Sequence, residues 1–442
     1  MSLSGTFKRK GKVPEIGSWG NDYRYNLLLL IPVINALADS TIYYFSTPYA
    51  EGINPGIIRG VVLLIFIAFF GLKRIINTRV NKIILFFLAY LFILTILSSS
   101  FRVSFLTGYI KWFVAFMMFP IGFYYIRTHD SLIRLILAFI AGALIICINL
   151  VAAQFTGYGI SAYVDDSFYI GGAGVGITNQ LALVILMFPV ILRVWDRYSR
   201  PVRWLIIITG ILSLLFVVLS MKRAGRIGLA GGGLIFFYLT PNKRKVLKYL
   251  FLVAFIILVT FPFYQDILME RYNARIEQTK LIEEEGRYME FFYVMQEFRE
   301  GNIWHKLFGS EAFNTAQFFG PKYFNRGRMI HGDFSAYVYG SGLAGIFLYF
   351  SIFGMLFMQI RIYHKRYGEI RIIQEIVASF YSVLAATFLI SATGSGSIGE
   401  KCMVYLFFGA VLGYLSRFQA GNEILRAGKI RSKTGLAWPD KR

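Results

Sequence analysis

The stretch LIRLILAFIAGALIICINLVAAQF, residues 132–155, decides the class of this fold because Arg134 is its single charged side chain. A helix needs about 20 consecutive, mostly apolar residues to cross the hydrocarbon core of a bilayer. The stretch meets that length without an interruption. It therefore predicts a transmembrane helix.

Runs of the same kind recur along the whole chain. Of its 442 residues, 56% are hydrophobic and 16% are charged, whereas soluble domains average about 25% charged residues. The composition predicts an all-α polytopic membrane protein. We expect about twelve transmembrane helices, over residues 25–46, 56–72, 81–98, 105–126, 132–155, 175–194, 202–220, 226–240, 246–263, 332–359, 374–392 and 398–416.

Most Lys and Arg residues lie in every second loop between these runs. The basic segments are 8–24, 73–82, 127–134, 193–203, 241–248, 361–371 and 417–442. Cytoplasmic loops carry the excess of Lys and Arg in membrane proteins, so both termini are predicted to be cytoplasmic. The net charge of +22 then reflects topology and contact with anionic membrane lipid. It does not indicate a nucleic-acid partner.

This topology divides the chain into four parts. Residues 1–263 are the first nine transmembrane spans, 264–330 a large loop outside the cytoplasm, 331–416 the last three spans, and 417–442 a basic cytoplasmic tail. A folded loop of this size is expected to form a lid over a site in the bundle. Within it, GRYMEFFYVMQEF (286–298) has apolar residues at helical spacing, namely Tyr288, Phe291, Phe292, Met295 and Phe298. We expect that apolar face to lie on the membrane surface or to cap the bundle.

Several ionisable side chains lie at the outer ends of apolar runs, where the loop pattern does not predict them. They are Lys222, Arg223, Arg226, Arg326, Arg328, His331 and Asp333. A charge at membrane depth costs about 2.5–3.5 kcal/mol on insertion scales, so such residues indicate a functional site. Arg59, Arg102 and Lys111 lie within or beside apolar runs, where they either extend to the interface or belong to that site.

Four elements, in order, resemble the O-antigen ligase/polymerase superfamily. They are Ser-x-x-Arg at Ser220–Arg223, Gly-Arg at Arg287 before an aromatic amphipathic helix, the LFGSE turn around Gly309, and His331 opening a helix with Gly342-x-x-Gly345. The resemblance covers roughly residues 200–360 in motif and the whole chain in the number of spans. Ligases commonly have His-Asn where this chain has His331-Gly-Asp, which favours the polysaccharide polymerase (Wzy-type) branch.

The resemblance implies a GT-C-like glycosyltransferase of the bacterial inner membrane that acts without a metal or other cofactor. Its implied substrates are undecaprenyl-diphosphate-linked oligosaccharide repeat units, and a protein that regulates chain length remains open as a partner. No metal-ligand spacing, Walker loop or Rossmann glycine fingerprint occurs in the sequence.

The chemistry of such a reaction fits the charged residues. A polyprenyl diphosphate is a good leaving group, so the reaction needs cations for the diphosphate and a base for the attacking sugar hydroxyl. Arginine presents a planar fork suited to phosphate oxygens. We assign the diphosphate to Arg223 and Arg287, and the base to His331.

Further substrate contacts are expected from Lys222, Arg102, Arg326 and Arg328. Asp333 either caps its helix, orients His331 or binds a sugar hydroxyl. Tyr337 is a candidate for stacking on a sugar.

Two alternatives remain at this point. An O-antigen ligase, which transfers glycan to the lipid A core, shares the donor chemistry. A flippase for lipid-linked oligosaccharides would also need cations and many spans, but internal repeats would be expected, and a folded outer loop hinged on a His would not.

Overall fold

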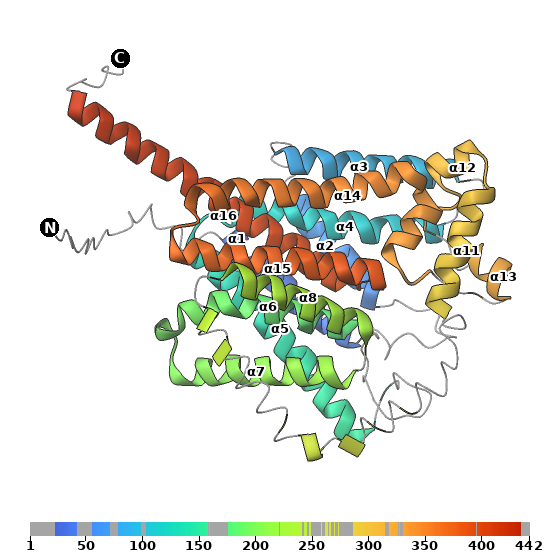
Figure 1. The fold of residues 1–442 in the computed structure, drawn as a ribbon, viewed down its shortest axis with the longest axis horizontal. Helices are drawn as coiled ribbons and strands as arrows, with labels where there is room; N and C mark the ends of the chain where they lie inside the picture. Colours follow the sequence, from blue (N-terminus) through green and yellow to red (C-terminus); the bar gives the residue numbers. More distant parts are fainter. Residues whose placement is uncertain are drawn as a thin grey trace.

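A computed structural model of the chain is helical throughout its described part. It describes residues 23–41, 55–70, 78–98, 103–157, 176–220, 222–240, 286–313, 318–325, 330–394 and 396–434, with isolated positions elsewhere. Helices account for 89% of the structure, and no β-strand occurs among the described residues. Figure 1 shows long helices running side by side, with shorter helices gathered at one end.

Each predicted apolar run except 246–263, which lies almost wholly outside the described residues, coincides with a helix. The helices are α1 (Tyr23–Thr41), α2 (Pro55–Phe70), α3 (Arg79–Leu97), α4 (Val103–Tyr125), α5 (His129–Thr156), α6 (Ile177–Arg193), α7 (Arg200–Leu219), α8 (Arg223–Leu239), α14 (Asp333–Tyr367), α15 (Arg371–Thr393) and α16 (Ile398–Thr434). Among the described residues, six stretches are long and apolar enough to cross a membrane: 79–97, 129–156, 200–219, 333–367, 371–393 and 398–419. The length and apolar composition of these helices indicate a helical membrane protein.

Two groups of loops meet at opposite ends of the bundle. At the basic end, the Tyr25 hydroxyl donates to the Ser131 carbonyl (3.1 Å), and the Arg417 guanidinium donates to the Phe123 carbonyl (3.1 Å). The other end holds α11 (Gly286–Glu300), α12 (Ile303–Phe308) and α13 (Phe319–Phe324). The loop arrangement predicted from Lys and Arg spacing agrees with this separation of the two ends.

Glycines allow α4 and α16 to pack backbone against backbone. A Cβ on Gly409 would lie 2.0 Å from the Phe119 carbonyl oxygen, and one on Gly122 would lie 2.3 Å from the Leu406 carbonyl oxygen. Only residues without a Cβ permit this approach. This packing places the first part of α16 in the centre of the bundle. Residues 402–415 are almost fully buried there.

A kink at Gly342 (φ 62°, ψ −162°) divides α14 into two segments. The turn at the end of α12 fits against this kink, since a Cβ on Gly309 would lie 2.5 Å from the Gly340 carbonyl carbon. Gly309 itself has a φ of 80°, which favours glycine. The Gly340–Gly342 segment thus receives a turn of the large loop.

The structure differs from the predicted boundaries at the C-terminus. Residues 417–434, predicted as part of a separate tail, continue α16 as one helix. Figure 1 shows this helix extending past the others at the end opposite α11–α13.

Candidate functional site

His331 lies where the outer helices join the bundle, two residues before α14. Its ring Nδ1 is 2.8 Å from Glu290 Oε1, and its backbone N–H donates to Glu290 Oε2 (2.9 Å). An ionised carboxylate only accepts hydrogen bonds, so Nδ1 carries the hydrogen and Nε2 keeps its lone pair. The His331 side chain is 50% exposed, whereas that of Glu290 is 2% exposed. In the neutral imidazole, Nε2 is therefore the nitrogen that can accept a proton.

Packing of α11 against α14 places Glu290 beside His331. Val294, one turn after Glu290, is buried with Phe319, Ile330 and Tyr339. On the same side of α11, the Tyr293 ring stacks on Tyr323 with ring centroids 4.5 Å apart.

An ion pair between Glu297 and Lys322 also joins α11 to α13. The hydrogen bond to Glu297 raises the pKa of Lys322. These contacts fix the helix that presents Glu290.

The aromatic face of α11 does not pack against the bundle. Tyr288, Phe291 and Phe292 are about half exposed, and with Met295 they line a groove on the outer side. The inward side carries Glu290, Val294 and Glu297 at i, i+4 and i+7. The aromatic face therefore does not cap the bundle, because the inward face meets α13 and α14. Its other predicted place, on the membrane surface, stays a prediction. The helical spacing of Glu290 and Glu297 is the sequence signal for this inward face, which the hydrophobic pattern did not identify.

Asp333 has a different partner from those predicted. Its carboxylate Oδ1 accepts from Lys401 Nζ (2.9 Å), and Oδ2 accepts from the Ser391 hydroxyl (3.2 Å). The residue is 3% exposed, and the N-cap position of α14 is Gly332. The Asp333 side chain therefore does not cap α14 and does not contact His331. Its burial also does not fit the predicted contact with a sugar hydroxyl.

Lys401 is held from a second direction by an aromatic ring. Its Nζ lies 3.7 Å from the centroid of the Trp112 ring, and the residue is 9% exposed. A desolvated cation over a Trp face is stabilised by about 2 kcal/mol. Together with the ion pair, this contact ties α4 and α16 to the start of α14, next to His331.

Tyr337 also lies in the interior. It is 5% exposed, and its ring packs between Trp112 (centroids 5.0 Å apart) and Tyr349 (4.5 Å). Both neighbours cover the ring, so the predicted stacking of Tyr337 on a sugar does not fit this structure.

Two of the cations predicted to contact the substrate, Lys222 and Arg223, lie at the same end of the bundle as His331. Lys222 is the N-cap of α8 and the exposed Arg223 is its first residue. A Cβ on Gly225 would lie 2.8 Å from Asn179 Oδ1 in the first turn of α6, and the neighbouring Gln180 amide donates to the hydroxyl of Ser397, which directly precedes α16 (2.9 Å). The start of α8 is therefore adjacent to the starts of α6 and α16.

The remaining assigned cations cannot be placed in the same detail. Arg287 is the second residue of α11, one turn before Glu290, and its side chain lies outside the described part. Arg102, Arg326 and Arg328 also lie outside the described residues.

Several helix N-termini meet at this end of the bundle. Asp333, the first residue of α14, donates its N–H to the Gly394 carbonyl between α15 and α16 (3.1 Å). The starts of α6, α8, α14 and α16 are thereby close to one another. Each helix N-terminus carries about half a positive charge. The C-termini of α7 and α15 lie at the same end and carry the opposite partial charge, so Lys222 and Arg223 are the groups here that favour an anionic ligand.

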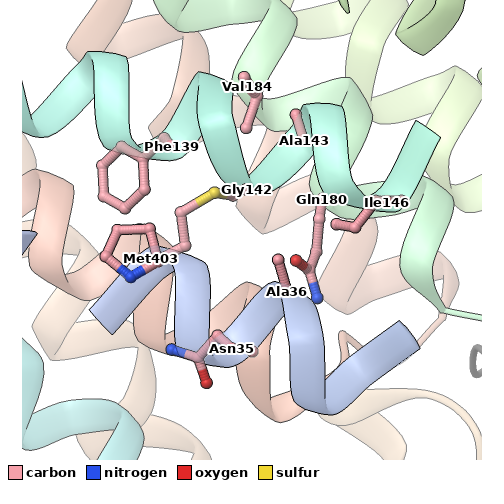
Figure 2. A pocket seen from close by; sticks show the side chains of 11 residues that line it. Asn35, Ala36, Phe139, Gly142, Ala143, Ile146, Gln180, Val184 and Met403 are labelled. Atoms are coloured by element: carbon pink, nitrogen blue, oxygen red, sulfur yellow. The ribbon is translucent and has the colours of Figure 1, made fainter. Parts of the chain in front are cut away.

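A second buried polar cluster lies between α1, α2 and α6. Arg59, 6% exposed, forms an ion pair with Asp39, so it does not extend to the interface. The Gln180 amide donates to Asp39 and to Ser397 (2.9 Å). Figure 2 shows Gln180 and Asn35 beside a small pocket whose other walls are apolar, including Phe139 and Val184. Sequence reasoning flagged Arg59 but not its partners.

Within the described residues, no three His, Cys, Asp or Glu side chains are close enough together to hold a metal ion.

In comparisons with known proteins, no family model matches this chain, and no curated protein sequence matches it.

Proposed function

We propose that this protein is an O-antigen or surface-polysaccharide polymerase. It joins undecaprenyl-diphosphate-linked repeat units at the outer face of the bacterial inner membrane. The observation that carries the proposal is His331 with Nδ1 bound to buried Glu290 and Nε2 available. Lys222 and Arg223 lie at the same end of the bundle, at the start of α8. The proposal includes a GT-C-like fold of about twelve spans, with both termini in the cytoplasm.

The proposed reaction is a direct displacement at the anomeric carbon. The acceptor sugar hydroxyl attacks that carbon, its proton passes to His331 Nε2, and the bond from carbon to the diphosphate oxygen breaks. Undecaprenyl diphosphate leaves with the bonding electrons, and the anomeric configuration inverts. The reaction draws on no metal, since Arg223 and Arg287 stabilise the diphosphate.

Glu290 acts on this reaction through His331. Its carboxylate holds the ring in one tautomer and stabilises the imidazolium that forms when Nε2 takes the proton. Asp333, Lys401 and Trp112 fix the start of α14, and so the backbone on which His331 is carried.

An O-antigen ligase would use the same donor and the same base, so only the acceptor separates it from a polymerase. Purified protein incubated with lipid-linked repeat units alone tests this point. A ladder of longer lipid-linked glycans is the polymerase result, while glycan transfer that requires lipid A core is the ligase result. A protein that regulates chain length would change the ladder's length distribution and not its formation.

A lipid-linked oligosaccharide flippase is the second candidate, and the buried charges favour it. Arg59–Asp39 and Lys401–Asp333 are ion pairs inside the bundle, and ionisable groups at membrane depth often mark transport pathways. Proteoliposomes separate the two functions. Movement of labelled lipid-linked repeat units across the bilayer without any new glycosidic bond would replace the polymerase proposal.

A further inference from the structure

The outward side of α12 is apolar along its whole length. Ile303 and Trp304 are 62% and 66% exposed, and Leu307 and Phe308 are 37% and 38% exposed. The rings of Trp304 and Phe308 stack with centroids 5.8 Å apart and an interplanar angle of 16°. Residues at i, i+1, i+4 and i+5 share one side of a helix. Leaving such a surface in water costs about 25 cal/mol per Å², so a stable protein is expected to cover it.

This surface continues the lipid-facing surface of the bundle. α12 packs against α14, where Leu343 and Phe347, just after the kink, are 47% and 69% exposed. The neighbouring helix α3 ends with Leu97, which is 72% exposed. Directly after it, the Ser98 hydroxyl donates to Glu311 Oε2 (2.6 Å), so the chain after α12 lies on the end of α3. Exposed apolar side chains of membrane-spanning helices face lipid, and α12 extends that area beyond the helix ends.

Polar groups border the same surface on the side away from the bundle. Asn302 caps α12 by accepting from the His305 N–H (2.9 Å), and Arg299 and Glu300 end α11 just before it with exposed side chains. A Trp at the edge of an apolar surface, with cations beside it, is typical of the interface between headgroups and acyl chains. Short apolar faces bordered by basic residues lie in that interface.

We propose that α12 is a membrane-interface helix, with Ile303, Trp304 and Phe308 inserted between lipid headgroups. The partner is the bilayer, not another protein. α12 ends on the Gly340–Gly342 kink, and the first segment of α14 leads back from there to His331. Insertion of α12 therefore sets the height of His331 relative to the headgroups. This last consequence rests on the proposed function, because the diphosphate of a lipid-linked substrate lies at headgroup level.

Site-directed spin labelling of the full-length protein tests the proposal without any activity assay. Cys147 and Cys402 are first replaced by Ser, which leaves a background without cysteine. A nitroxide is then attached at Trp304→Cys, with Asn302→Cys as the matched control on the polar edge. The proteins are reconstituted in vesicles of phosphatidylethanolamine and phosphatidylglycerol, and collision rates with oxygen and with a water-soluble nickel chelate are measured.

We expect the label at 304 to collide more with oxygen than with the nickel chelate, and the label at 302 to show the reverse. Equal nickel accessibility at 304 and 302 would overturn the proposal. Spin–spin broadening at 304 would also overturn it, by assigning the surface to a second copy of the chain. Thermal unfolding of both labelled variants checks that they keep the fold. Failure of the polymerase assay would leave these collision rates unaffected, so the two proposals fail separately.

Discussion

Buried Glu290 contacts His331 twice, through the ring Nδ1 and through the backbone N–H. The two bonds fix both the rotation of the imidazole and the position of the chain that carries it. One carboxylate therefore determines which nitrogen of His331 is available to a substrate. A surface histidine without such a partner would exchange tautomers freely.

Replacing Glu290 by Gln tests the positioning role. Gln keeps the size of the side chain but offers Nδ1 a neutral group that no longer favours one tautomer. We expect kcat to fall about 10- to 1,000-fold, less than the 10²–10⁴-fold contribution of the general base itself, with little change in KM. Steady-state kinetics on lipid-linked repeat units measures both. Glu297→Gln on the same helix is the control, and an equal loss there would show that α11 had merely shifted.

Removing the Lys401 ammonium should destabilise the bundle. Lys401→Met leaves the buried Asp333 carboxylate without its cation, which costs about 3–5 kcal/mol for a buried pair. Thermal unfolding in detergent should show a lower Tm than wild type. The double variant with Asp333→Asn should recover part of the loss, because no buried charge is then unpaired. A double variant less stable than Lys401→Met would contradict this account of the pair.

Two glycines in long helices should respond oppositely to the same substitution. Gly409→Ala forces a methyl group toward the Phe119 carbonyl in the α4–α16 contact, and overpacking of this kind costs about 1–3 kcal/mol. Gly354→Ala adds a methyl group that meets no atom within 4 Å apart from its chain neighbours and the nearby backbone of its own helix. It should be neutral or stabilising, since Ala is favoured over Gly in helices by about 1 kcal/mol. Similar Tm values for the two variants would argue against the close α4–α16 approach.

The proposed orientation predicts which end of the bundle is outside the cell. A cysteine at Asn302 should react with a membrane-impermeant maleimide in cells whose outer membrane is permeabilised. One at the exposed Lys365, at the basic end, should react only after the inner membrane is broken. The Cys147→Ser, Cys402→Ser background serves here as well. The reverse pattern would place His331 in the cytoplasm and remove the basis of the polymerase proposal.

The sequence predicted the helices well because hydrophobic length is a local property. The run at 132–155 lies within α5 (His129–Thr156), and the other described runs match their helices to within a few residues, apart from the longer C-terminal ends of α14 and α16. The alternation of basic loops also predicted which helix ends lie together. These signals need only neighbouring residues and the thickness of a bilayer.

The site was harder to predict because its contacts join distant segments. Glu290 and His331 are 41 positions apart, and Lys401 and Asp333 are 68 positions apart. On α11, the hydrophobic pattern pointed to the aromatic face as the important one. The opposite, inward face holds the Glu290 carboxylate, which is buried against His331. No rule based on spacing alone identifies such a partner before the tertiary arrangement is known.

The most direct test of the central claim is the rate of glycan polymerisation by purified His331→Ala with lipid-linked repeat units. His364→Ala, near the other end of α14, is the matched control, and equal yields of folded membrane protein establish the comparison. The account predicts a loss of about 10²–10⁴-fold for His331→Ala and wild-type rates for His364→Ala. Polymer formed by His331→Ala at the wild-type rate would contradict it.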